Sequence, residues 1–112
     1  MEKKETKRNT LKEAVFNTIS GKATKNNPIN AKDLCSEYQI TFRELKQLIT
    51  ELRTDYPIVS KETNGGGYWL AENEQDIVEF INMIDRRRRG YEETIKMMQK
   101  FMADYGNIPF ID

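Results

Sequence analysis

One segment decides the fold of this 112-residue chain, residues 30–70, whose sequence is NAKDLCSEYQITFRELKQLITELRTDYPIVSKETNGGGYWL. Its first half contains two stretches with apolar residues at helical spacing, and only two or three residues separate them. So short a link forces the two helices to meet at a sharp corner. Its second half contains two apolar stretches around Asn64-Gly65, a pair that favours the positive φ angles of hairpin turns. The segment therefore predicts a helix, a corner, a second helix and a β-hairpin, in that order.

Polar side chains mark where these two helices begin. Asn30 can cap the first helix, which we expect to run to about residue 38, and Asp33 stands at its third position. Thr41 and Glu44 form a capping box at the start of the second helix, which we expect over residues 42–54. The second helix should end before Pro57, because the residue that precedes a proline disfavours helical torsions. In the hairpin, alternation puts Tyr68 and Leu70 on one face, which we expect to be the core face, and Trp69 on the other. There Trp69 packs on a helix or the core, or meets a ligand.

Upstream of this segment the sequence predicts one more helix and a terminal arm. Thr10 and Glu13 form another capping box, apolar residues follow at helical spacing, and Gly21 stops the helix. Residues 1–8 are charged and lack a periodic apolar pattern, so we expect a flexible basic arm there. Its cations either follow a phosphate backbone or simply solubilise the chain. The expected globular domain therefore covers residues 9–71.

Residues 72–105 carry a different pattern, an apolar repeat with alternating spacings of four and three. Its members are Ile77, Ile81, Ile84, Arg88, Tyr91, Ile95, Met98, Met102 and Tyr105. This heptad spacing predicts a coiled coil, and hence a homodimer formed through the C-terminal helix. Arg88 is the one charged residue of the seam, and in a parallel pair Arg87 would oppose Glu92 of the other chain. Residues 106–112 form a short tail with no assigned role.

Gly90 leaves two arrangements of this region open. One is a continuous helix, and the other is a pair of helices over residues 74–89 and 91–105, folded as a hairpin. The unbroken heptad phase across Gly90 favours the continuous helix. The four arginines at positions 86–89 point in different directions on a helix, which favours solvated charge over a single patch for DNA, an acidic partner or a membrane surface.

Composition excludes several classes of function. The chain has no histidine and one cysteine, Cys35, so an internal disulfide and a Cys/His zinc site are both excluded. We expect a buried structural thiol at Cys35, no catalytic residues, no metal and no cofactor. No apolar run approaches the roughly 18 residues of a membrane span, so we expect a cytoplasmic protein with no membrane partner. The net charge is zero, yet residues 1–70 hold 12 Lys/Arg against 9 Asp/Glu, and residues 71–112 hold 6 against 9.

Residues 10–71 resemble a winged helix-turn-helix DNA-binding domain. The resemblance is carried by INAKDLC at 29–35, ITFREL at 40–45, YPI at 56–58 and GYWL at 67–70. This wing with a trailing helix is similar to small proteins of bacteriophages and other mobile elements of Gram-positive bacteria. The resemblance implies binding of double-stranded DNA in transcription regulation or replication. One departure is the corner, where Tyr38-Gln39-Ile40 stands in place of the glycine that many such domains have. The expected fold class is thus mainly α with a small β-hairpin, a winged helix-turn-helix followed by a long C-terminal helix.

Outward-facing residues of the second helix are the candidate DNA contacts. With the apolar residues 45, 48, 49 and 52 turned to the core, helix 42–54 would present Arg43, Lys46, Gln47 and Thr50 to the major groove. Arginine suits a bidentate contact with guanine, and glutamine suits adenine. The wing, residues 58–70, would touch the DNA backbone through Lys61, Asn64 and the N–H groups around Gly65.

A protein-interaction module is the alternative. In that case the winged helix would bind a host replication or transcription factor. The zero net charge and the acidic stretch at residues 72–79 favour this alternative. A basic face shared by helix 42–54 and the wing would favour DNA, whereas a mixed or apolar face would favour a protein.

Overall fold

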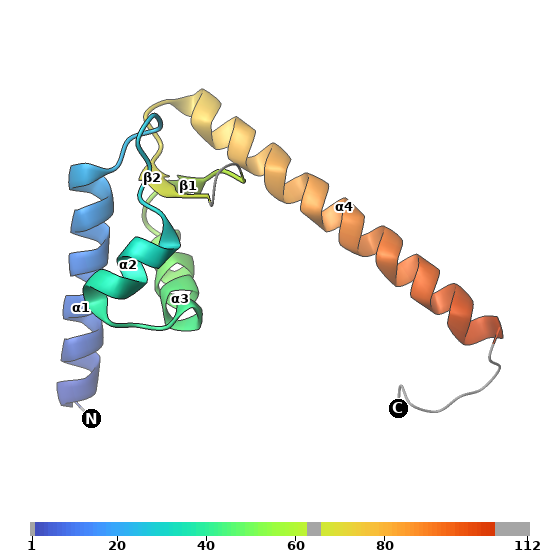
Figure 1. Cartoon of the computed structure of the whole chain (residues 1–112), viewed down its shortest axis with the longest axis horizontal. Coiled ribbons are helices and arrows are strands. Elements are labelled where there is room, and N and C mark those ends of the chain that lie inside the picture. The colour runs from blue at the N-terminus through green and yellow to red at the C-terminus, as the bar shows by residue number, and fades with distance from the viewer. Residues whose placement is uncertain (1, 63–65, 105–112) are drawn as a thin grey trace. The chain divides into compact units, whose positions relative to one another are not determined.

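The computed structural model describes residues 2–62 and 66–104, with side chains from residue 6 onward. In chain order the elements are α1 (Glu2–Lys22), α2 (Ala31–Tyr38), α3 (Phe42–Leu52), β1 (Ile58–Ser60), β2 (Tyr68–Leu70) and α4 (Glu74–Asp104) (Figure 1). The predicted fold class, mainly helical with a small β-hairpin and a long C-terminal helix, is confirmed. The chain divides into two compact units, residues 1–80 and 81–112. Within the described ranges no helix has the length and apolar character needed to cross a bilayer.

Helix α1 starts much earlier than the sequence suggested. It begins at Glu2, so the predicted start at Thr10 is wrong, and residues 2–8, expected as a flexible arm, are helical. Residues 2–9 contain no Gly or Pro and are rich in Glu, Lys and Arg, which have high helix propensity. Arg8 also donates a hydrogen bond to Glu51 of α3, with 2.6 Å between Nη2 and Oε2. This contact ties the early turns of α1 to the rest of the domain.

The core of residues 1–80 lies between the first three helices and the hairpin. Helix α1 packs on α2, α3 and β2. The side chains that fill the core are at most 5% exposed, and they are Val15, Ile19, Leu34, Leu45, Leu48, Ile49, Leu52, Ile58, Val59 and Trp69. Four of them come from α3, whose apolar face is therefore fully used in packing. Burying one such side chain contributes about 1.5–3 kcal/mol to the free energy of folding.

The hairpin is short and is braced by the loop that precedes α2. β1 and β2 pair antiparallel, with Ile58 opposite Leu70 and Ser60 opposite Tyr68. Ile29 extends the ladder, because its N–H donates to Tyr68 O at 3.1 Å and its carbonyl accepts from Tyr68 N at 2.8 Å. Gly67 has φ +149°, and a Cβ at this position would lie 2.6 Å from Cβ of Pro28. The base of the hairpin therefore has room only for glycine.

Trp69 is the hairpin residue in the core. Its side chain is 4% exposed, whereas Tyr68 and Leu70 are half-buried at the edge of the core. The expectation that Tyr68 and Leu70 form the core face is therefore wrong, and core packing as the role of Trp69 is confirmed. The large indole can be buried because its N–H has a partner, the carboxylate of Asp76 at 3.2 Å.

The predicted caps of α2 and α3 are present. The Asn30 side chain accepts from the N–H of Asp33 at 2.8 Å, and both hydrogen bonds of the Thr41–Glu44 capping box form. Between the helices, Gln39 takes the left-handed conformation, with φ 53° and ψ 49°, and the N–H of Ile40 donates to Cys35 O at 3.1 Å. The corner thus forms without glycine because Gln39 adopts the torsions that a glycine would normally supply.

Helix α4 is continuous through Gly90, so the predicted continuity is confirmed and the two-helix hairpin does not form. Asn73 caps it, since its Oδ1 accepts from the N–H of Asp76 at 3.0 Å. Around Gly90 the helix carries ion pairs within itself: Arg88 contacts Asp85 at 2.6 Å and Glu92 at 2.9 Å. Such pairs, three and four residues apart, favour the helix and counter the cost of the glycine.

The torsions of Gln39 give the first testable prediction. Replacement Gln39→Val should lower the free energy of unfolding by about 1–2 kcal/mol, because a β-branched side chain is strained in the left-handed region. The matched replacement Gln39→Gly should leave stability equal or slightly higher. Urea unfolding followed by circular dichroism measures both. Equal stability of the valine and glycine variants would contradict this account of the corner.

Candidate functional site

The exposed face of α3 gathers four of the seven residues that the sequence nominated for DNA contact. Arg43, Lys46, Gln47 and Thr50 are all exposed and line one shallow hollow. The same hollow is lined by Phe42 and Glu51 of α3 and by Arg8 of α1. The arrangement follows from the helical period, because four buried apolar residues on one side leave these residues on the other.

The polar groups in this hollow differ in how far they are already engaged. The ammonium of Lys46 lies 4.8 Å from the centre of the Phe42 ring, and the Thr50 hydroxyl donates to the carbonyl of Lys46 at 2.9 Å. Within the described ranges, neither Arg43 nor Gln47 makes a side-chain hydrogen bond or ion pair. Their donors therefore stand free on the first two turns of α3.

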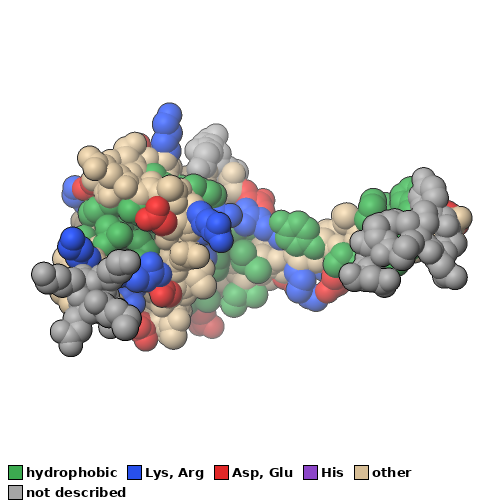
Figure 2. Space-filling model, turned by 90° about the horizontal axis from the view of Figure 1, so that it is seen from below, with side chains coloured by type: hydrophobic (Ala, Val, Ile, Leu, Met, Phe, Trp, Pro, Cys, Tyr) green, Lys and Arg blue, Asp and Glu red, His purple; other side chains and the backbone are tan. Residues whose placement is uncertain are grey.

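The charge of the hollow is positive but not uniformly so. Three cations, Arg8, Arg43 and Lys46, surround one carboxylate, Glu51, which is paired with Arg8. The Phe42 ring, 52% exposed, adds an apolar surface. A similar mixture appears on the face of the molecule shown in Figure 2, where Lys and Arg side chains lie among acidic and hydrophobic ones.

Three residues that line the hollow, Arg8, Phe42 and Glu51, are not among the candidate DNA contacts derived from the sequence. The sequence predicts Arg8 in a flexible arm whose cations either follow a phosphate backbone or solubilise the chain, and the contact with Glu51 places Arg8 beside α3. Phe42 follows the capping residue Thr41 and falls outside the apolar set of α3, at residues 45, 48, 49 and 52. An aromatic residue off the buried face of an amphipathic helix indicates an exposed apolar surface, and this indication can be found in the sequence alone.

Lys61, the one nominated wing residue that the structure describes, does not line this hollow. Lys61, which follows β1, is half-buried and its ammonium donates to the carbonyl of Lys25 at 3.5 Å. Asn64 and Gly65, the other two nominated wing residues, lie outside the described residues. The contacts that the structure gives therefore place four of the seven nominated DNA-binding residues together.

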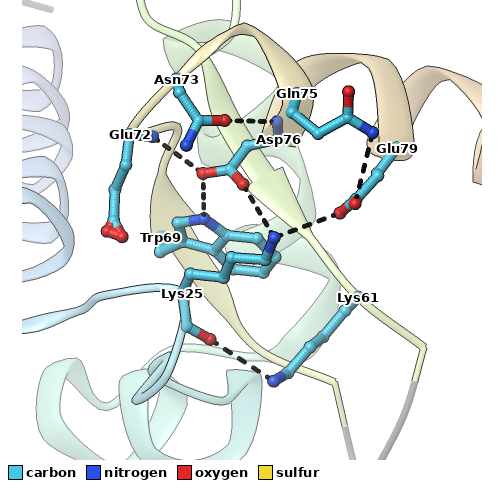
Figure 3. Close-up of polar contacts among 8 residues, drawn as sticks. All are labelled: Lys25, Lys61, Trp69, Glu72, Asn73, Gln75, Asp76 and Glu79. Atoms are coloured by element: carbon cyan, nitrogen blue, oxygen red, sulfur yellow. Dashed lines mark hydrogen bonds and ion pairs between the residues drawn. The ribbon is translucent and has the colours of Figure 1, made fainter.

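A second polar cluster surrounds the buried carboxylate of Asp76 (Figure 3). Asp76 is 1% exposed, and its Oδ2 accepts from the indole N–H of Trp69 at 3.2 Å and from the N–H of Glu72 at 2.9 Å. The ammonium of Lys25 lies 3.3 Å from Oδ1 and 3.4 Å from Glu79. Oδ1 receives no hydrogen bond from the described residues.

The electrostatics of this cluster favour ionised Asp76. The backbone N–H of Glu72 holds the pKa of Asp76 below its ordinary value, and Trp69 and Lys25 act in the same direction against the effect of burial. The neighbouring carboxylates of Asp76 and Glu79 raise the pKa of Lys25. Across the described ranges, no group of three or more His, Cys, Asp or Glu side chains is placed to hold a metal ion. The contacts of Asp76 join β2, the loop after α1 and the start of α4, and we call this set of contacts the Asp76 lock.

Replacement Asp76→Asn tests this lock. It keeps an oxygen for Trp69 and Glu72 but removes the charge beside Lys25, and we expect the free energy of unfolding at pH 7 to fall by about 1–3 kcal/mol. Since the folded-state pKa of Asp76 is depressed, its contribution is present above about pH 4 and is lost as pH falls through the lower folded value. The difference between wild type and variant should therefore shrink towards pH 2.

Urea unfolding followed by the fluorescence of Trp69, the single tryptophan, measures this difference at pH 7 and at low pH. Glu79→Gln is the control, because Glu79 is the exposed partner of Lys25. The urea midpoint of the Glu79→Gln variant should stay close to that of the wild type. A pH-independent difference between Asp76→Asn and wild type would refute the role of the Asp76 charge.

The predicted dimer residues lie on α4. Ile77 is half-buried, whereas Ile81, Ile84, Arg88, Tyr91, Ile95, Met98 and Met102 are exposed.

Comparison of this chain with models of known protein families, with curated proteins and with solved structures found no match.

Proposed function

We propose that residues 2–80 form a winged helix-turn-helix domain that binds double-stranded DNA, with α3 in the major groove. The observation that carries the proposal is the exposed face of α3, where Arg43, Lys46 and Gln47 stand together beside Arg8. The element order supports it, because α2 and α3 meet at a short corner and the hairpin follows directly. The setting we propose is transcription regulation or replication of a phage or other mobile element.

The dimensions of α3 suit this role. Its 11 residues span about 16 Å, and an α-helix fits the roughly 12 Å width of the major groove. Arg43 and Gln47 are four residues apart, about one helical turn, so both can reach base edges from one helix face. We assign Arg43 to guanine and Gln47 to adenine, and Lys46 and Arg8 to phosphate oxygens.

The hairpin is the proposed second contact. It follows α3 after a short connection, and the Ile29–Tyr68 bridge fixes its base to the loop before α2. In this proposal residues 58–70 lie along the DNA backbone, with Lys61, Asn64 and Gly65 as contacts. The ammonium of Lys61 would exchange the carbonyl of Lys25 for a phosphate oxygen, which is a stronger, charge-assisted acceptor.

The exposed Phe42 favours a second candidate function, recognition of a host replication or transcription factor. Aromatic and arginine side chains are enriched at protein interfaces, and Phe42 and Arg43 are adjacent on the rim of the hollow. The neutral chain and the mixed charges around α3 point the same way. DNA binding remains the first proposal because the two uncommitted polar groups of the face, Arg43 and Gln47, are those that read base edges.

Fluorescence anisotropy on duplex DNA tests the first proposal. Wild-type protein should bind random-sequence DNA at 50 mM salt and lose affinity steeply by 200 mM, because phosphate contacts release counterions. On a site selected from a random library, Arg43→Ala with Gln47→Ala should cost about 1–3 kcal/mol per residue and abolish the preference for that site.

The control for this experiment is Lys22→Ala, which removes one exposed cation from the opposite end of α1 and should leave site preference intact. Trp69 fluorescence verifies that each variant is folded. Retention of site preference by the double variant would overturn the role of α3. Failure of wild type to bind any DNA at 50 mM salt would transfer support to the protein-binding function, for which Phe42→Ala is then the informative variant.

Glu51 offers an independent prediction. Replacement Glu51→Gln removes the only carboxylate lining the hollow in the described part of the chain and releases Arg8 from its ion pair. We expect affinity for random-sequence DNA to rise and the salt dependence to steepen by about one phosphate contact. The matched change Glu13→Gln, on exposed α1 surface, should have a smaller effect. Unchanged affinity and salt slope for Glu51→Gln would place the DNA away from this hollow.

A further inference from the structure

Exposed apolar side chains are concentrated on one element, α4. Within the described residues, nine of the eleven exposed large hydrophobic side chains belong to it. They are Val78, Ile81, Ile84, Tyr91, Ile95, Met97, Met98, Phe101 and Met102. Exposed fractions reach 70% at Tyr91 and 55% at Ile95. A cluster of apolar side chains this large on a protein surface marks an interaction site.

The spacing of the seam residues on α4 indicates that the partner is another helix. From Ile81 to Met102 the seam follows the alternating four-three spacing, with Arg88 as its one charged member. Six of the nine exposed residues lie on this seam, and Val78, Met97 and Phe101 lie beside it. Apolar side chains at this alternating spacing provide the geometry by which two helices supercoil. We propose that residues 81–104 pair with the same segment of a second copy of this chain, as a parallel, in-register coiled coil.

In a parallel, in-register pair, each seam residue lies opposite the same residue of the other copy. Ile81 and Ile95 then occupy a positions, where β-branched residues favour two-stranded parallel coils, and Ile84 and Met98 occupy d positions. Arg87 at a g position comes to lie near Glu92 at the following e position of the other copy. That contact is attractive, and two-fold symmetry forms it twice.

Arg88 is the residue that must be accommodated at the centre of the pair. Its guanidinium already contacts Asp85 at 2.6 Å and Glu92 at 2.9 Å within its own helix. The two carboxylates raise the pKa of Arg88 and keep it charged and partnered. Two copies of Arg88 therefore approach each other with each guanidinium already paired to carboxylates. A single polar a position of this kind specifies register at some cost in stability.

This inference does not rest on DNA binding, because it concerns residues outside the α3 face. If both proposals hold, each dimer carries two copies of α3 and would engage a repeated or palindromic site. The test of the dimer uses no DNA, so its failure and the failure of the proposed function are distinguishable.

Sedimentation equilibrium of the full chain at tens of micromolar tests the proposal. The expected mass is twice the 13.2 kDa of one chain. Ile95→Glu should convert the dimer to monomer, since it places a charge at an a position of the seam. Met97→Glu is the matched control, because Met97 is 54% exposed and Ile95 55%, yet Met97 lies at a c position off the seam. It should leave the dimer intact.

Both side chains are exposed, so neither variant disturbs the core, and Trp69 fluorescence verifies this. A monomeric wild type at tens of micromolar would overturn the proposal. Loss of the dimer in both variants, or in neither, would overturn the assigned seam.

Disulfide cross-linking tests the orientation. In a Cys35→Ala background, Ile84→Cys should form an intermolecular disulfide on mild oxidation, because position 84 meets its own copy only in a parallel pair. In an antiparallel pair that aligns the a and d layers, position 84 instead lies opposite position 102. Cross-linking only between a chain carrying Ile84→Cys and one carrying Met102→Cys would therefore refute the parallel arrangement.

Discussion

The buried carboxylate of Asp76 is the interaction on which the domain of residues 1–80 depends. A charge that is 1% exposed is tolerated only where donors and an opposite charge surround it. The donors are the indole of Trp69 in β2 and the N–H of Glu72, and the opposite charge is the ammonium of Lys25 in the loop after α1. One side chain thus fixes the hairpin, the loop after α1 and the first turn of α4 against each other, and burial of Trp69 in the core follows from it.

The fold and the candidate site share a single constraint in α3. Four apolar side chains of this helix are at most 5% exposed, so the helix cannot rotate about its axis without exposing them. The opposite face, with Arg43 and Gln47, is consequently held in one orientation by core packing. The capping box at Thr41 and Glu44 adds a fixed helix start, and it holds the carboxylate of Glu44 in the cap.

Local signals in the sequence were sufficient for the caps at Asn30 and Thr41, for the hairpin and for the continuity of α4, because each depends on neighbouring residues. They failed where a distant residue decides. The position of Arg8 beside α3 depends on its contact with Glu51, 43 residues away in sequence. Alternation in β2 separates Trp69 from its neighbours but does not say which face is inside; the partner at Asp76 decides that. The engagement of Lys61 with the Lys25 carbonyl likewise requires the folded loop.

The two proposals strengthen each other in physical terms. A single α3 face with three cations and one carboxylate offers few phosphate contacts, and a chain with zero net charge gains little from non-specific attraction. One domain acting alone would therefore bind DNA weakly. Pairing through α4 would change this, because once one domain of a dimer is bound, the second binds at the high effective concentration set by the connection. Specific recognition by a neutral protein of this kind would then come from two sets of base contacts, with Arg43 and Gln47 in each.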